Sequence, residues 1–181
     1  MPDQLERPRQ MIASADYARL MARYNAWQND SLLDAAATLS PAARAAERGA
    51  FFGSIIGTLS HLLWADLTWM ARFDGGAAPR DGIRQSAAMV TDWTAYRSER
   101  AATDLRIRDW AAGLDDSALA RDLTFHSGAL GREVTRPTDL CVAHFFNHQT
   151  HHRGQVHAML TAAGAAPGDT DLFVMPEETR P

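Results

Sequence analysis

The chain has 181 residues and no lysine: all 18 basic residues are arginines, and 22 acidic residues bring the net charge to −4. The arginines are scattered, which argues against the clustered basic face of a nucleic-acid-binding protein. No apolar stretch approaches the roughly 18 residues that span a bilayer, and the N-terminus lacks the apolar run of a signal peptide. We therefore expect a soluble, cytoplasmic protein without nucleic-acid or membrane partners, with one domain over residues 1–181.

The N-terminal half predicts two long helices joined by a short one. Apolar residues recur at three- and four-residue spacing over about 14–39, which indicates an amphipathic helix. A serine followed by a proline at 40–41 is typical of a helix start, so a short helical turn is expected before Gly49. Ser54 is expected to cap the next long helix, which ends at the glycine pair 75–76.

The C-terminal half predicts two more long helices with a small hairpin between them. Gly128 and Gly131 mark the turn of the hairpin, Gly164 ends the last helix, and a tail follows from about 165 to 181. In chain order the expected elements are a helix over about 86–112, a turn over 115–119, strands near 123–125 and 133–135, and a helix over about 139–163. This pattern predicts an all-α antiparallel four-helix bundle with a small hairpin-like insertion before the last long helix.

Four of the seven histidines fall between positions 144 and 152. Residues four apart share a helix face, so His144, His148 and His152 form a ladder, and His148 with His152 can chelate one metal ion. His151 lies close to the same face. His61, in the middle of another long helix, could project into the same interior, although a single core histidine is more often simply hydrogen-bonded. Spacing alone leaves several ligand sets open.

Neighbouring residues have ordinary interpretations beside functional ones. Gln149 stands where the metalloprotease pattern H-E-x-x-H has its glutamate, and a neutral amide cannot take a proton from a metal-bound water, which disfavours zincin-type peptide hydrolysis. Trp64 either walls a pocket beside His61 or is plain core. Arg153 is expected to be solvated or salt-bridged rather than an anchor for an anion. The two remaining histidines are expected at the surface or in a supporting role: His126 and His157.

Three segments, in the right order, resemble the DinB family of DinB/YfiT-like metalloenzymes. They are YNAWQN at 24–29, GTLSHLLWAD at 57–66 and HFFNHQTHHRGQ at 144–155, and the ending over 164–172 also fits. The resemblance implies a four-helix bundle that holds a divalent metal through one histidine of the second helix and two of the last, spaced H-x-x-x-H. The implied ligands are His61, His148 and His152. A supporting or substrate-facing role is left for His144 and His151.

The implied site has a definite chemistry. Three neutral imidazoles suit Zn or Ni first, with Fe, Co or Mn as alternatives, and they leave a coordination position open. Relatives in the wider superfamily include thiol transferases that use bacillithiol or mycothiol, and a mycothiol-dependent maleylpyruvate isomerase. By resemblance we expect a metal-dependent transferase that activates a small thiol for attack on an electrophile. Cys141, the only cysteine, lies in an apolar helical segment and is expected in the core rather than as a nucleophile.

Two other functions stay open. A metal-bound hydroxide could hydrolyse a substrate, and His151 is then the tentative catalytic base. Alternatively, the protein could be a non-catalytic metal-binding protein of a stress response. A homodimer through exposed helix faces is the expected assembly.

Overall fold

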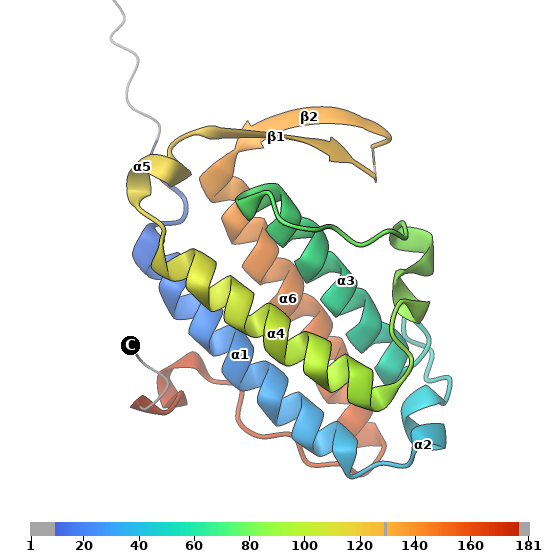
Figure 1. The fold of residues 1–181 in the computed structure, drawn as a ribbon. Coiled ribbons are helices and arrows are strands. Elements are labelled where there is room, and N and C mark those ends of the chain that lie inside the picture. Colours follow the sequence, from blue (N-terminus) through green and yellow to red (C-terminus); the bar gives the residue numbers. More distant parts are fainter. Residues whose placement is uncertain (1–9, 129, 178–181) are drawn as a thin grey trace, which may run out of the picture.

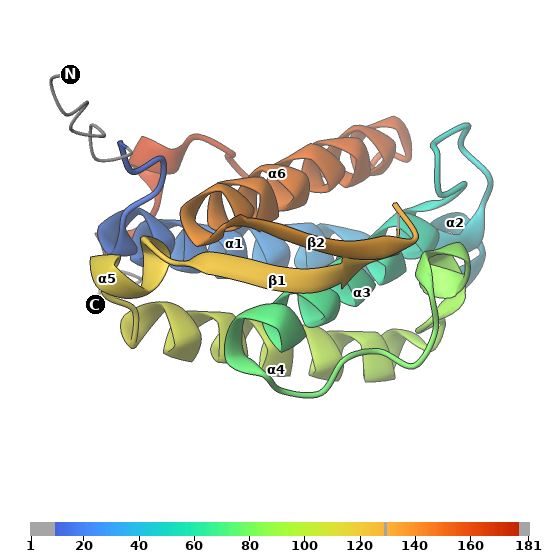
Figure 2. The same cartoon turned by 90° about the horizontal axis from the view of Figure 1, so that it is seen from above.

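The computed structural model describes residues 10–128 and 130–177, and most of them are helical. Four long helices, α1, α3, α4 and α6, run side by side, and a two-stranded hairpin lies over one end (Figures 1 and 2). The elements are α1 (Ala15–Ala37), α2 (Pro41–Ala45), α3 (Ile55–Asp74), the 3-10 helix η1 (Ile83–Ala88), α4 (Trp93–Ala112), α5 (Asp116–Leu119), β1 (Asp122–Ser127), β2 (Arg132–Pro137), α6 (Thr138–Ala162) and the 3-10 helix η2 (Leu172–Val174).

Serine caps start the helices of the N-terminal half, as predicted. The side chains of Ser14, Ser40 and Ser54 each accept a hydrogen bond from a backbone N–H three residues later, which satisfies one of the free donors of the first turn. Gly75 ends α3 in the left-handed conformation, with φ 73°, which a glycine adopts without strain. Local signals of this kind explain why the sequence predicts these boundaries closely.

The long helices pack in a closed cycle. α1 contacts α4 and α6, and α3 contacts the same two helices. Figure 1 shows α1 and α6 running one way and α3 and α4 the other, with the connection through η1 returning along the length of α3. A mostly helical chain with one small antiparallel hairpin is thus confirmed, whereas the antiparallel four-helix bundle stays a prediction. No helix among the described residues is long and apolar enough to cross a membrane.

A buried polar layer separates two apolar cores at mid-height. The core near the hairpin includes Ile107 and Phe146, and the core at the far end includes Leu63 and Leu160. Between them Arg100 of α4 is 1 % exposed and bridges two carboxylates, Asp66 of α3 at 2.7 Å and Asp104 at 2.8 Å. Gln149 of α6 donates to Asp66 at 2.9 Å, and two asparagines of α1 donate to Asp104. All four long helices therefore meet in this layer.

The predicted helix over 86–112 starts too early. Residues 83–88 form η1, and α4 begins only at Trp93. Asp92 caps α4 by accepting from the N–H of Ala95 at 2.8 Å, which fixes the helix start there. The Ser60 side chain on α3 donates to the carbonyl of Ser86 and accepts from the N–H of Val90 at 3.0 Å. These tertiary contacts hold the segment against α3 in place of a further turn of α4.

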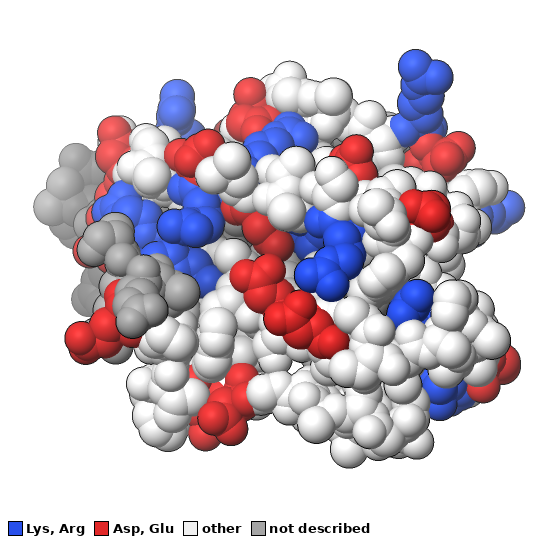
Figure 3. Space-filling view, turned by 60° about the horizontal axis from the view of Figure 1, so that its bottom comes forward, with Lys and Arg blue, Asp and Glu red and all other residues white. Residues whose placement is uncertain are grey.

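The hairpin and the C-terminal segment cover the bundle from outside. β1 pairs antiparallel with β2, with Phe125 opposite Val134, and both strands contact α6 (Figure 2). The tail lies along α1, where Tyr24 donates to the carbonyl of Thr170. On the face shown in Figure 3, acidic and basic side chains are interspersed. The extreme N-terminus, where no signal peptide is expected, and the last four residues of the predicted tail lie outside the described residues.

Candidate metal centre

The structure brings together His61, His148 and His152. His61 projects from the middle of α3, and the other two lie on successive turns of α6, on the same face. One ring nitrogen from each lies within 4.8 Å of the other two. His61 and His152 are buried and His148 is half-buried. These three side chains could hold a metal ion, and that they do so stays a prediction.

The hydrogen bonds of Ser86 fix the tautomer of His61. The Ser86 hydroxyl donates its single proton to the carbonyl of Ile83 at 2.7 Å, and His61 Nδ1 lies 2.8 Å from the same oxygen. Because that proton is already used, Nδ1–H of His61 must be the donor in the second contact. His61 Nε2 therefore carries a lone pair, the form that a metal ligand requires.

His152 is oriented in the same manner by Gln155. Its Nδ1 lies 2.7 Å from Gln155 Oε1, an oxygen that can only accept, so Nδ1 carries the proton and Nε2 a lone pair. That Nε2 lies 3.1 Å from Nε2 of His148. Two nitrogens bound tetrahedrally to one zinc ion at ~2.0–2.1 Å lie roughly 3.3 Å apart, so the pair fits a shared divalent ion. With one ring nitrogen of His61 within 4.8 Å of both, the three histidines could hold a metal ion.

The surroundings keep the three imidazoles neutral. Burial, with a smaller effect of His152, lowers the pKa of His61 to about 4. Burial followed by the neighbouring histidines lowers the pKa of His148 to about 3. Burial also lowers the pKa of His152, although the hydrogen bond that its Nδ1–H donates to Gln155 acts in the opposite direction. All three rings are consequently neutral imidazoles at neutral pH and available to a cation.

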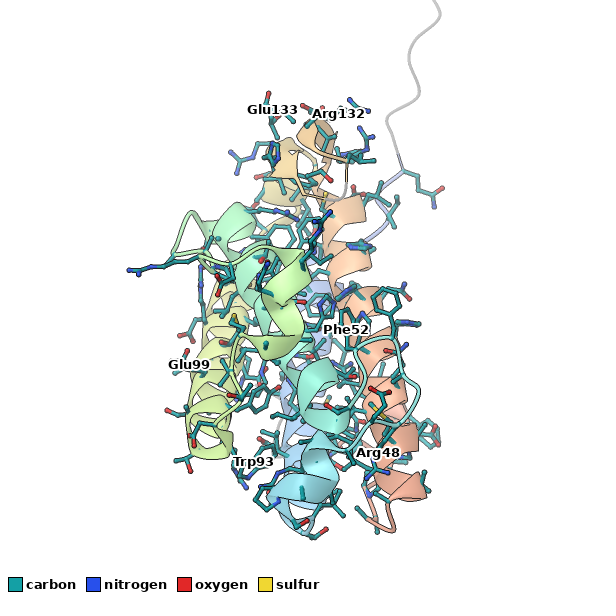
Figure 4. The ribbon with its side chains drawn as sticks, turned by 90° about the vertical axis from the view of Figure 1, so that its right-hand side faces the viewer. Arg48, Phe52, Trp93, Glu99, Arg132 and Glu133 are labelled. Atoms are coloured by element: carbon teal, nitrogen blue, oxygen red, sulfur yellow. The ribbon has the colours of Figure 1, made fainter. Side chains whose placement is uncertain are left out.

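Phe52 covers one side of the site. Its ring stacks on His61 with centroids 3.7 Å apart and meets His152 edge-on at 5.5 Å. It belongs to the connection between α2 and α3, which Figure 4 shows against the middle of the helices. Sequence reasoning missed both Phe52 and Ser86, because neither lies in a helical pattern that points to the site. The motif GTLSH contained one usable signal, since Ser60 anchors the segment that carries Ser86.

A cavity of about 870 Å³ opens beside the histidines. His61, His148 and His144 line it, together with residues of the hairpin and of the connection that follows α3. Trp64 is a wall of this cavity, and its indole N–H donates to the carbonyl of Asp81 at 2.7 Å. Most of the lining is apolar, as in pockets for small organic molecules.

The other candidate residues take varied places. His151 is exposed, its Nε2 lies 3.2 Å from the amide nitrogen of Gln155, and it does not line the cavity. His126 is exposed on β1 at the cavity rim. Cys141 is buried, as predicted, although it reaches the cavity wall, and burial raises the pKa of its thiol. The expectation of a solvated or salt-bridged Arg153 is wrong: this side chain is 4 % exposed and donates to an amide oxygen of α1.

Comparison with known proteins identifies the family that the chain matches. The family profile described as the DinB family matches residues 11–180. The chain is also similar to "Protein DinB" of Bacillus subtilis (strain 168), with 28% identity over 171 residues. This alignment covers 91% of the chain and 98% of the relative.

Proposed function

Because the chain belongs to the DinB family over residues 11–180, we propose that it is a metal-dependent transferase that activates a small thiol for attack on an electrophile. His61, His148 and His152 hold the ion, with Zn or Ni as the first candidates and Fe, Co or Mn as alternatives. The observation that carries the proposal is the convergence of three neutral imidazoles at the edge of a large, mostly apolar cavity. A structural zinc site would instead be closed by a fourth protein ligand.

The chain's own residues prepare such a reaction. Ser86 and Gln155 fix two of the imidazoles in the ligand form, and the ring of Phe52 packs against both. A bound divalent ion would supply an open position that lowers the pKa of a thiol. The cavity beside it receives the electrophile. Cys141 is a poor competing nucleophile, since burial raises the pKa of its thiol.

Hydrolysis is the second candidate, and one observation favours it. His144 lines the cavity next to His148, with ring centroids 5.9 Å apart, and burial together with Arg72 lowers its pKa. A neutral imidazole at this place is suited to accept a proton from water. The tentative base from the sequence, His151, stays a prediction, but His144 lines the cavity and His151 does not, which makes His144 the better residue to test. A non-catalytic stress-response protein is the third candidate.

Cobalt substitution tests the proposal. The wild-type protein is loaded with Co²⁺ and titrated with 2-mercaptoethanol, with ethylene glycol as the matched alcohol. We expect stoichiometric cobalt and a sulfur-to-cobalt charge-transfer band with the thiol alone. His148→Ala should lose the cobalt, whereas His157→Ala, on the same helix but outside the converging nitrogens, should keep it.

The outcomes separate the candidates. Suppose that cobalt binds but the thiol gives no charge-transfer band, and that the protein hydrolyses an ester without any thiol. If His144→Ala then abolishes this hydrolysis, hydrolysis replaces thiol transfer as the proposed function. A wild-type protein that binds no divalent ion would refute both. Binding of the ion with neither a thiol band nor hydrolysis would favour the non-catalytic role.

Three further expectations remain proposals. The cyclic contacts among α1, α3, α4 and α6 support the four-helix bundle that the resemblance implies. We propose a homodimer on the sequence alone, and size-exclusion chromatography with light scattering would detect it. A cytoplasmic location without nucleic-acid or membrane partners is likewise proposed on the sequence alone.

A further inference from the structure

Arg72, in the last turn of α3, is a half-buried arginine that lines the cavity. Its guanidinium lies 4.4 Å from the ring centroid of Trp69 and 4.4 Å from that of Phe125, so an aromatic ring flanks it from α3 and another from β1. Its hydrogen bond is a long one, 3.4 Å, to the carbonyl of His126. Among the described residues no carboxylate forms an ion pair with it, although Arg106 nearby is paired with Asp74 at 2.7 Å.

Arg72 is a half-buried cation that no carboxylate of the described residues neutralises. Burial lowers the pKa of Arg72, as expected of a charge taken partly out of water without a partner. The charged side chains that line the cavity are Arg72, Arg136 and Asp81, so the lining is net positive in a chain of net charge −4. Arg136 donates to the carbonyl of its neighbour Thr135 and likewise forms no ion pair among the described residues. The cavity therefore combines apolar walls with an unmatched positive end.

Helix geometry gives the distance between this positive end and the histidines. Arg72 follows His61 by eleven residues, so both lie on nearly the same face of α3, with Cα atoms roughly 16 Å apart along the axis. The guanidinium leans back over Trp69, about one turn toward the histidines. On α6, His144 and Cys141 line the same cavity as Arg72, one and two turns before His148. Both helices place the guanidinium roughly 10 Å from the histidine nitrogens.

We infer that the cavity binds an elongated organic acid, whose acidic group pairs with Arg72 and whose apolar body lies against Trp64, Trp69 and Phe125. The planar guanidinium offers two parallel donors to a carboxylate or sulfonate, which a point charge would not. The other end of the acid, roughly 10 Å away, faces the histidines. The inference rests on the proposed function only for this last part, since the acid site is defined without the metal.

A pair of fluorescent probes tests the acid site in both the metal-free and the zinc-loaded protein. 8-Anilinonaphthalene-1-sulfonate carries an acidic group on an apolar body, and N-phenyl-1-naphthylamine is its neutral counterpart. We expect Arg72→Gln to weaken binding of the sulfonate about tenfold or more and to leave the neutral probe unchanged, because a charge-assisted contact is lost. Arg97→Gln, which removes the same charge from an exposed position on α4, should change neither.

Two controls keep this test decisive. Near-UV circular dichroism confirms that each variant keeps its tertiary packing, because the sulfonate also binds loosely packed states. If Arg72→Gln does not fold, the wild-type protein still decides: rising salt should weaken the sulfonate and leave the neutral probe unaffected. Equal behaviour of the two probes in the wild type, or equal loss of both in Arg72→Gln, would overturn the inference.

A mercapto acid carries a thiol and a carboxylate, so one such ligand tests the histidines and Arg72 in the same experiment. In the cobalt-loaded protein, 8-mercaptooctanoate, which can span the distance, should bind more tightly than 8-mercapto-1-octanol or the short 3-mercaptopropionate. Arg72→Gln should abolish its advantage over the alcohol. If no thiol gives a charge-transfer band but the sulfonate still depends on Arg72, thiol activation fails and the acid site stands. If thiols bind but Arg72→Gln changes neither the preference for the sulfonate over the neutral probe nor that for 8-mercaptooctanoate over 8-mercapto-1-octanol, the acid site is refuted and thiol activation stands.

Discussion

Replacing Ser86 with alanine tests how the metal site is prepared. Ser86 is fully buried, and its hydroxyl oxygen accepts the Nδ1–H of His61 at 2.8 Å. In Ser86→Ala that N–H either stays buried without a partner, at a cost of about 1–3 kcal/mol, or moves to Nε2, where it blocks the metal. Loss of such a contact behind a ligating histidine typically weakens metal binding by about tenfold to a hundredfold. We expect zinc affinity to fall within this range.

The assay is competition for zinc with a chromogenic chelator near neutral pH. Ser60→Ala is the matched control, because it removes two hydrogen bonds to the same segment and keeps the Ser86 hydroxyl that accepts from His61. Both variants should lower the free energy of unfolding of the metal-free chain, but only Ser86→Ala should weaken zinc binding. Unchanged zinc affinity in Ser86→Ala, or an equal loss in Ser60→Ala, would refute the assignment of the tautomer.

Two predictions concern stability. Arg100→Met leaves two buried carboxylates without their cation and should lower the free energy of unfolding by about 3–5 kcal/mol in urea melts. Arg97→Met, on the exposed side of α4, should cost less than about 1 kcal/mol, and equal losses would contradict a structural role for the polar layer. The second concerns pH: His61 and His148 have folded pKa values of about 4 and about 3, below the 6.5 expected when unfolded. At these two histidines the folded metal-free chain binds fewer protons than the unfolded chain, so their contribution to stability should be complete above the unfolded pKa and be lost as pH drops from about 6.5 towards about 3. Burial raises the pKa of Asp104 to about 6, which acts with the opposite sign in this range, so urea melts compare the wild type with His148→Ala. Equal slopes in the two proteins would contradict neutral burial of the histidines.

Local signals explain what the sequence predicts well. Ser14, Ser54 and Gly75 act within one turn of the helix ends that they define, so the boundaries of α1 and α3 follow from the residues alone. The spacing of His148 and His152 likewise follows from helix periodicity. The third histidine, His61, is brought to them only by the packing of α3 against α6, and spacing alone left it open.

Long-range contacts explain what the sequence does not predict. The segment over 86–92 has helical periodicity, but hydrogen bonds to Ser60 hold it on α3. Arg72 is ordinary in the sequence and becomes notable only when β1 brings Phe125 over it. Arg153 looks like a surface arginine and is buried, because the polar layer offers it partners from α1. Each case depends on residues more than twenty positions away in the chain.

The cavity is lined partly by long helices and partly by connecting segments. The histidines stand on α3 and α6, two helices that pack against each other, whereas much of the remaining lining comes from the connection over 78–83 and from the hairpin. Connections tolerate substitution and changes in length far better than helix interiors do. Exchanging the hairpin between relatives should therefore change which molecules fit the cavity and leave the three histidines on the two helices untouched.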